Sequence, residues 1–134
     1  IVMQLPHSAL LVAHDRQIRD RLRDILESFG IEVSVVRRSE TAVALLEERS
    51  LGGPKRQFSL VVTERDMPHK PALALIDDLR ETPALVNIPV LVVAPKISDS
   101  ERMIAHRLRH CRFSLQHASR ESLRTDIGML ADQA

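Results

Sequence analysis

The sequence predicts a single α/β domain built on a parallel sheet with helices on both faces. Five short apolar segments recur along the chain, and a helix-like pattern follows each of them. The segments lack polar alternation, which is typical of strands that are buried on both faces. Strands that alternate with helices favour right-handed crossovers, so we expect a doubly wound sheet.

The first strand and helix have clear start and stop signals. The strand is expected over residues 9–13 (ALLVA), and Asp15 stands where a residue can cap the following helix. Apolar residues then recur at helical spacing until Gly30, which is a typical helix terminator. The expected buried stripe consists of Ile18, Leu22, Ile25, Leu26 and Phe29.

The same cycle repeats four more times. The further strands are expected at 32–36, 59–64, 89–94 and 113–116. The further helices are expected first to carry Val43, Leu45 and Leu46, next to carry Leu73, Ile76 and Leu79, and then to span 99–110 and 121–130. Ser39 is expected to cap the second helix, and the polar stretch 47–57 is predicted to be a loop-like insertion.

Length and composition indicate an ordinary folded domain. The chain has 134 residues, of which 44% are hydrophobic, with 19 Lys and Arg against 18 Asp and Glu. These values exclude disorder and allow one domain over 1–134, with its core at about 9–130. No apolar run approaches the roughly 20 residues of a membrane span, and no signal-peptide pattern is visible. Because the chain also starts at Ile1, we expect a cytoplasmic piece of a longer multidomain protein.

Several kinds of chemistry have no support in the sequence. Four glycines provide neither a phosphate-binding loop nor a dinucleotide fingerprint, and no Ser/His/Asp set has a suitable spacing. Cys111 is the only cysteine, so it cannot form an internal disulfide, and without a CxxC partner it is expected to be a semi-buried structural thiol. We therefore do not expect the domain itself to be an enzyme.

The central sequence resembles a known family. The stretch SLVVTERDMPHKPALALIDDLRETPALVNIPVLVVAP is similar to the middle of two-component receiver domains, including the Met-Pro after the third strand and the Ile-Pro-Val before the fourth. The intervals of 30 residues from Glu64 to Ala94 and 22 residues from Ala94 to Gln116 also agree. The resemblance extends from Ala9 to about Leu130. It implies a flavodoxin-like sheet with strand order 2-1-3-4-5.

Receiver domains use five side chains at the carboxyl ends of their strands. Two carboxylates after the first strand help to hold Mg²⁺, an Asp after the third accepts the phosphoryl group, a hydroxyl follows the fourth and a Lys follows the fifth. At these places the sequence has Ala13, His14, Glu64, Ala94 and Gln116. None keeps the residue type of the family. The chain therefore resembles a pseudo-receiver, and we expect no metal or other cofactor.

Two interpretations of Glu64 at the acceptor position remain open. Its fixed negative charge could imitate a phosphorylated receiver, but Ala94 and Gln116 offer neither the hydroxyl nor the ammonium group that would respond to it. Alternatively, it is a carboxylate at the rim of the pocket, either solvated or paired with Arg65 or Lys96.

Two other chemical roles for residues at the same edge of the sheet have less support from the sequence than a degenerate pocket. The acidic and imidazole groups that follow the first and third strands could form a metal cluster, but their spacing matches no dedicated metal motif. That cluster would consist of His14, Asp15, Glu64 and Asp66. Phosphorylation of Asp66 is disfavoured because this residue lies two positions beyond the acceptor and lacks an assisting Lys.

A basic segment lies near the carboxyl end of the sequence. Residues 101–124 contain six Arg and two Glu, although the net charge of the whole chain is only +1. Receivers use this region for docking or dimerisation. Phe113 stands where the family commonly has an aromatic residue that takes part in switching. The expected interaction face consists of Arg102, Arg107, Arg109, Arg112 and Phe113. The alternative is a solvated helix face with scattered ion pairs.

The resemblance implies a signalling module that acts through phosphorylation-independent contact with a protein or a neighbouring domain. The parent would be a two-component phosphorelay protein, either a hybrid sensor histidine kinase or a response regulator, and a homodimer remains open. One alternative is an anionic ligand such as a cyclic dinucleotide on the Arg-rich face. A true phosphoacceptor with an atypical site is another alternative. Membrane association and DNA binding by this domain are not expected.

Overall fold

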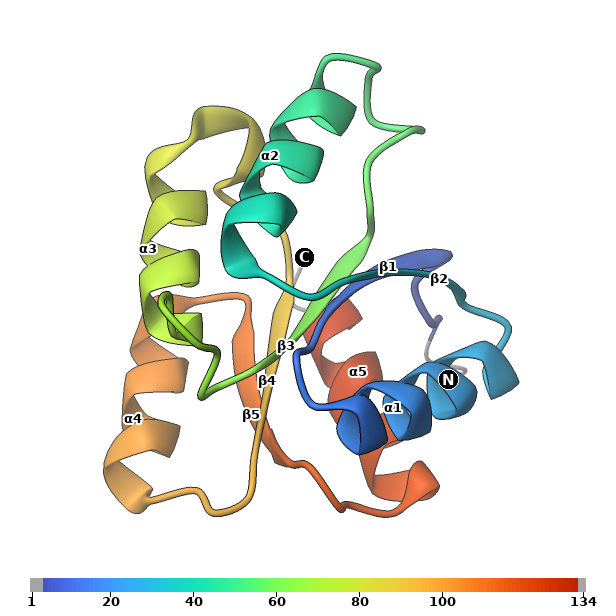
Figure 1. Ribbon diagram of the computed structural model, residues 1–134, viewed down its shortest axis with the longest axis vertical. Coiled ribbons are helices and arrows are strands. Elements are labelled where there is room, and N and C mark those ends of the chain that lie inside the picture. The colour runs from blue at the N-terminus through green and yellow to red at the C-terminus, as the bar shows by residue number, and fades with distance from the viewer. Residues whose placement is uncertain (1–3, 133–134) are drawn as a thin grey trace.

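The computed structural model describes residues 4–132 and contains a five-stranded parallel sheet in the order β2-β1-β3-β4-β5 (Figure 1). The strands are β1 (Ser8–Val12), β2 (Glu32–Val36), β3 (Leu60–Glu64), β4 (Val90–Ala94) and β5 (Cys111–Leu115). The helices are α1 (Arg16–Ser28), α2 (Ser39–Ser50), α3 (Ala72–Glu81), the short 3₁₀ helix η1 (Pro83–Leu85), α4 (Asp99–Leu108) and α5 (Arg120–Asp132). The predicted fold class and strand order are confirmed.

The sheet separates two apolar layers. Helices α1 and α5 cover one face, and α2, α3 and α4 cover the other (Figure 1). Residues of β1 alternate between the layers, since Leu10 and Val12 pack toward α2 and α3 whereas Ala9 and Leu11 pack toward α1 and α5. Every residue of β3 and β4 is buried, as expected for central strands with helices on both sides.

Strand register brings the carboxyl ends of the central strands to one edge. Thr63 of β3 pairs with Val12 of β1 and with Val92 of β4, and Val93 pairs with Ser114 of β5. The residues that directly follow β1, β4 and β5 therefore lie along the same edge as the end of β3. Ligand sites of open parallel α/β sheets are usually found there.

The signals predicted for α1 are confirmed, but the cap predicted for α2 is wrong. Asp15 caps α1, with its Oδ1 accepting a hydrogen bond from the Ile18 N–H at 3.0 Å. Ser39 instead lies within the first turn of α2 and is fully buried, and its hydroxyl donates to the Lys70 carbonyl at 2.8 Å. The side chain thus ties α2 to the segment before α3, a contact between distant residues that local sequence patterns do not reveal.

Most boundaries differ from those predicted by one or two residues, including those of β1 and α5, and three of the differences concern α2, α4 and β5. The polar stretch 47–57 begins as helix because α2 continues to Ser50. Helix α4 ends at Leu108, since the next two residues have left-handed backbone conformations. Strand β5 starts earlier than predicted because Cys111 pairs with Val90. Cys111 is only 7% exposed, so the thiol is more deeply buried than the semi-buried position that was expected.

The buried stripe of α3 is also corrected. Ile76 and Leu79 are fully buried, as predicted, but Leu73 is 37% exposed. Ala72 and Leu75 are buried in its place. These buried residues follow the i, i+3, i+4, i+7 spacing of one helix face, which leaves Leu73 outside that face.

Candidate functional site

The carboxyl edge of the sheet brings together the five residues predicted for the degenerate pocket. Ala13 and Ala94 are fully buried and present only methyl groups. The Ala13 N–H donates to the Val36 carbonyl at 3.1 Å, and the Gln116 N–H donates to the Ala94 carbonyl at 2.8 Å. These bonds extend the sheet by one residue at its edge and fix the backbone on both sides of Glu64.

Glu64 is turned inward, toward the loop after β1. It is 7% exposed, and its Oε2 accepts hydrogen bonds from the backbone N–H groups of His14 at 2.6 Å and Asp15 at 3.1 Å. The His14 Nδ1 lies 3.5 Å from the same oxygen. The reading of Glu64 as a solvated rim carboxylate is therefore wrong. A buried carboxylate needs such partners, because leaving its charge without hydrogen bonds would cost several kcal/mol.

Arg65 points away from Glu64 and joins β3 to α4. Its Nε and Nη2 donate to the two carboxylate oxygens of Asp66, each at 3.0 Å, and its Nη1 lies 3.0 Å from Glu101 Oε2. The same Nη1 donates to the Lys96 carbonyl at 2.8 Å. The hydrogen bond to Asp66 raises the pKa of Arg65, and it lowers the pKa of the Asp66 carboxyl. The proposed contact between Arg65 and Glu64 is therefore replaced by this network.

The hypothetical metal cluster does not assemble. The carboxylate of Asp15 is used to cap α1, and the carboxylate of Asp66 is paired with Arg65. Within residues 4–132, no three or more His, Cys, Asp or Glu side chains are placed to hold a metal ion. The groups closest to the Glu64 carboxylate are backbone N–H donors, which attract anions and repel cations.

Arg21 positions the loop that follows β5, and sequence analysis did not identify it. Its Nη1 donates to the Gln116 carbonyl at 3.0 Å and its Nη2 donates to the Ala118 carbonyl at 2.5 Å. The Gln116 side chain lies beside His117, with 3.3 Å between their Nε2 atoms. In the sequence Arg21 looks like any solvated arginine of an amphipathic helix, so no signal could have revealed its role.

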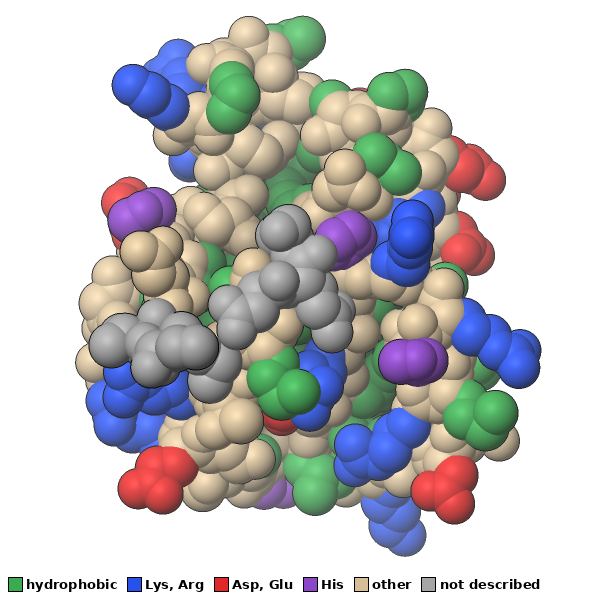
Figure 2. All heavy atoms as spheres, turned by 180° about the vertical axis from the view of Figure 1, so that it is seen from behind, with side chains coloured by type: hydrophobic (Ala, Val, Ile, Leu, Met, Phe, Trp, Pro, Cys, Tyr) green, Lys and Arg blue, Asp and Glu red, His purple; other side chains and the backbone are tan. Residues whose placement is uncertain are grey.

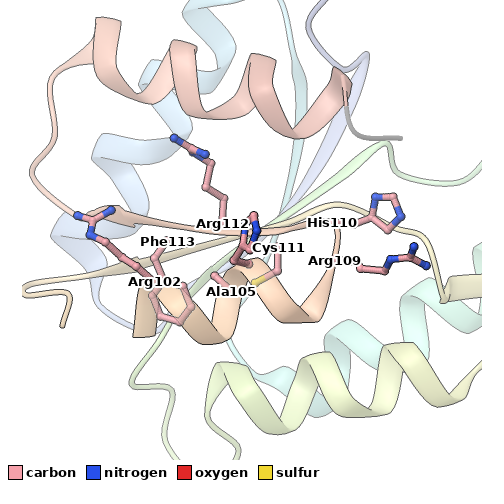
Figure 3. Close-up of a pocket in the computed structure, with 8 residues that line it drawn as sticks. Arg102, Ala105, Arg109, His110, Cys111, Arg112 and Phe113 are labelled. Carbon is pink, nitrogen blue, oxygen red and sulfur yellow. The ribbon is translucent and has the colours of Figure 1, made fainter. Parts of the chain in front are cut away.

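A second site lies between α4 and β5, where the interaction face was predicted. We define the α4–β5 cavity as a hollow of about 650 Å³ between these two elements. Its lining consists of Arg102, Ala105, His106, Arg109, His110, Cys111, Arg112 and Phe113. Figure 3 shows Cys111 and Ala105 between Arg102 and Phe113 at one end and Arg109 and His110 at the other.

The predicted face is thus largely brought together, with two corrections. Arg107 is exposed on α4 but does not line the cavity. Phe113 is only 4% exposed and belongs to the apolar core below the cavity, so its ring is not available as a contact surface. Arg112 is also partly engaged, because its Nε lies 2.8 Å from Asp126 Oδ1 of α5.

A partly buried arginine supports the end of this cavity. Arg80 of α3 donates to the carbonyls of Ile88 at 3.0 Å, Arg109 at 3.2 Å and His110 at 3.4 Å. Burial lowers the pKa of Arg80, and it also lowers the pKa of His110, which faces Arg80 and Arg109. Burial raises the pKa of Cys111 to about 11. The thiol is therefore uncharged at neutral pH and forms an apolar part of the lining.

The backbone beside Arg80 is unusual. Arg109 and His110 have φ values of +56° and +50°. Residues with side chains seldom adopt this region, and maintaining it requires support from the surrounding structure. The guanidinium of Arg80 gives that support by holding both carbonyl groups. Viewed from behind, basic and His side chains lie along the flank formed by α4 and β5 (Figure 2).

Comparison with solved structures identifies the architecture. The chain matches the receiver domain of a signal transduction histidine kinase from Syntrophus aciditrophicus with a TM-score of 0.74, at 21% identity and with 94% and 90% of the two chains covered. It matches the chemotaxis response regulator CheY4 of Vibrio cholerae with a TM-score of 0.77, at 15% identity and with 92% and 97% covered. The chain has the receiver-domain fold.

A third receiver structure contains a metal. The receiver domain of the sensor histidine kinase PA1611 from Pseudomonas aeruginosa, with a magnesium ion in its active-site cleft, matches with a TM-score of 0.78 at 13% identity, covering 94% and 98% of the two chains. No family model matches the chain, and no curated protein matches it in sequence. The receiver fold is therefore shown by structure, as the sequence resemblance predicted. None of the helices within residues 4–132 is long and apolar enough to cross a membrane.

Proposed function

We propose that this receiver-like domain is a pseudo-receiver, a two-component signalling module that acts through phosphorylation-independent contact with a protein or a neighbouring domain. The observation that supports this proposal is the hydrogen bonding of the buried Glu64 carboxylate. Its Oε2 accepts hydrogen bonds from the backbone N–H groups of His14 and Asp15, at the place where a receiver would carry its metal-binding carboxylates.

The chemistry of phosphoryl transfer has little support in this pocket. Receiver catalysis needs a cation to offset the negative charge of the transferred group. The side chain of Ala13 has no oxygen, and the N–H groups beside Glu64 would repel Mg²⁺. Ala94 has no hydroxyl, and Gln116 has an uncharged amide in place of an ammonium group. A phosphoryl group on Glu64 would therefore be poorly stabilised.

The α4–β5 cavity is the surface that we propose for docking. Arg102 and Arg109 are exposed beside the cavity, and guanidinium groups form paired hydrogen bonds with carboxylates. β5 is also an edge strand of the sheet, so a partner can approach it without displacing another strand. We infer that the partner presents an acidic surface, and a second copy of the chain is the alternative occupant.

The cellular location of the domain and the kind of parent protein are part of the same proposal. We propose that the module acts in the cytoplasm, within a hybrid sensor histidine kinase or a response regulator. In this proposal the domain itself has no catalytic activity, although the parent chain could be a histidine kinase. These statements rest on analogy with proteins of the same fold.

Beryllofluoride tests the pocket directly. The domain is mixed with Mg²⁺ and beryllofluoride, which mimics an aspartyl phosphate, and backbone amide resonances are recorded. A conventional receiver measured in parallel shows that the reagent is active. We expect no saturable change at Glu64, Ala94 or Gln116. Saturable shifts at these residues, or the addition of one phosphoryl group after incubation with a phosphodonor, would overturn the proposal.

Charge reversal tests the docking surface. We expect Arg102→Glu to reduce the output of the parent pathway, whereas Glu64→Gln in the same protein leaves output unchanged. Arg124→Glu on α5 is the matched control, because it makes the same change of charge at an exposed residue outside the cavity lining. Equal loss of output with Arg102→Glu and Arg124→Glu would show that overall charge matters and the cavity does not.

A further inference from the structure

A second hollow, away from the α4–β5 cavity, lies where α1 begins and β2 ends. We call it the α1–β2 hollow, and its volume is about 620 Å³. Its lining consists of His14, Arg16, Arg19, Asp20, Arg23 and Arg37. The three arginines of α1 are spaced by three and four residues and therefore share one face of the helix. Arg37 directly follows β2 and adds a fourth guanidinium from another element.

The positive charge of this hollow is poorly compensated. Arg16 lies 3.8 Å from Asp20, and Arg23 lies 3.6 Å from Glu27 outside the lining. Exposed pairs at such distances contribute little to stability. Within residues 4–132, the side chains of Arg19 and Arg37 form no ion pair or hydrogen bond. An anion would reduce the mutual repulsion of these guanidinium groups.

The lining also indicates the class of anion. It contains no Phe, Tyr, Trp or aliphatic side chain, so it offers little apolar surface to a ligand. Guanidinium groups match the geometry of phosphate oxygens and form paired hydrogen bonds with them. The lining carries four guanidinium groups and one carboxylate, so its positive charge exceeds the negative charge of a single phosphate. We propose that the α1–β2 hollow binds a compact polyphosphate with little apolar surface.

His14 connects this hollow to the degenerate pocket. Its side chain contributes to the lining, while its backbone N–H donates to Glu64 at 2.6 Å. A bound anion would therefore change the surroundings of a residue that also fixes the buried carboxylate. This gives the proposal a local readout at the His14 amide. The proposal does not depend on how the α4–β5 cavity is used.

Titration of the whole chain with inorganic triphosphate is the direct test. Calorimetry and backbone amide shifts are recorded at about 150 mM salt, where long-range attraction between exposed charges is largely screened. We expect saturable binding, with shifts confined to His14, residues 16–23 and Arg37. No saturation at millimolar triphosphate, or shifts centred on the α4–β5 cavity, would overturn the proposal.

Matched variants separate a site from general charge. Arg19→Gln combined with Arg37→Gln should weaken triphosphate binding by roughly tenfold or more. Arg102→Gln combined with Arg107→Gln removes the same charge from the exposed surface of α4 and should leave affinity within about twofold. Equal weakening by the two double variants would overturn the proposal. Circular dichroism of each variant confirms that the fold is retained.

Two competitors decide the ligand class. Sulfate at the same ionic strength carries a single tetrahedral anion, and equal affinity for sulfate would contradict the need for several phosphates. Duplex DNA at the same phosphate concentration tests a macromolecular ligand. Tighter binding of DNA through Arg19 and Arg37 would replace the proposed small ligand with a nucleic acid.

Discussion

The backbone N–H of His14 lies 2.6 Å from Oε2 of Glu64, so a side chain at the end of β3 fixes the loop that follows β1. The two residues are 50 positions apart in the sequence. Because the Asp15 N–H shares the same oxygen, one carboxylate satisfies two backbone donors that would otherwise be partly buried without partners. Glu64 therefore has a structural role that its place in a receiver pocket does not suggest.

Removing this carboxylate should destabilise the domain. Glu64→Ala leaves two backbone donors without their acceptor, and we expect a loss of about 2–3 kcal/mol in the free energy of unfolding. Glu64→Gln keeps an acceptor oxygen and should cost roughly 1 kcal/mol. Urea denaturation followed by circular dichroism measures both values. Equal stability of the wild type and Glu64→Ala would mean that the two N–H groups find other partners.

Arg80 should contribute strongly to the turn between α4 and β5. Arg80→Met removes the guanidinium that holds the carbonyls of Arg109 and His110, and we expect a loss of about 2 kcal/mol. Amide exchange at Cys111 should accelerate in the same variant. Arg107→Met, at an exposed position of α4, is the control and should change stability by less than about 0.5 kcal/mol. Similar losses in both variants would contradict a special role for Arg80.

His110 should make stability depend on pH near neutrality. Burial and the nearby Arg80 and Arg109 lower its pKa in the folded protein, so the unfolded chain binds a proton more readily. Stability should therefore fall as the pH decreases through the ordinary histidine pKa of about 6.5. His110→Asn keeps a residue that tolerates positive φ and removes the titration. Thermal midpoints measured from pH 8 to pH 5.5 should decrease less in this variant.

A matched histidine variant completes this test. His106→Asn changes an exposed imidazole in α4 and should retain the pH dependence of the wild type. If His110→Asn and the wild type lose stability in parallel over this range, another group controls the dependence.

Cys111 should react slowly in the folded state. Its side chain is buried, and burial raises its pKa to about 11, so very little thiolate exists at pH 8. A disulfide reagent at pH 8 should modify the native chain much more slowly than the urea-unfolded chain. The chain contains one cysteine, which gives an unambiguous stoichiometry. Equal rates in the two states would show that the thiol is accessible in the native protein.

The sequence predicted the fold more completely than the site, and the reason is physical. Strand burial and the Asp15 cap are local properties, so residue patterns were enough to predict them. The roles of Ser39 and Arg21 depend on backbone carbonyls that come close only after folding. Local patterns carry no information about such contacts.

The pocket predicted at the carboxyl edge of the sheet shows the same difference between local patterns and contacts that form only on folding. Its five residues lie at the predicted edge of the sheet because strand ends and intervals determine their place along it. The inward direction of the Glu64 side chain was not predicted, because it depends on hydrogen bonds from the N–H groups of His14 and Asp15, which are distant in the sequence. The α4–β5 cavity was foreseen as a basic face, but the inward position of Phe113 depends on its packing below α4.

The two hydrogen bonds from Arg21 have a consequence for motion. The guanidinium of Arg21, in the middle of α1, donates to the carbonyls of Gln116 and Ala118. A movement of α1 that keeps both hydrogen bonds must therefore also move the loop that follows β5. Slow opening of this region should occur as one cooperative event that spans nearly a hundred residues of sequence. A displacement of α1 would consequently be transmitted to the loop beside β5, which is an edge strand of the sheet.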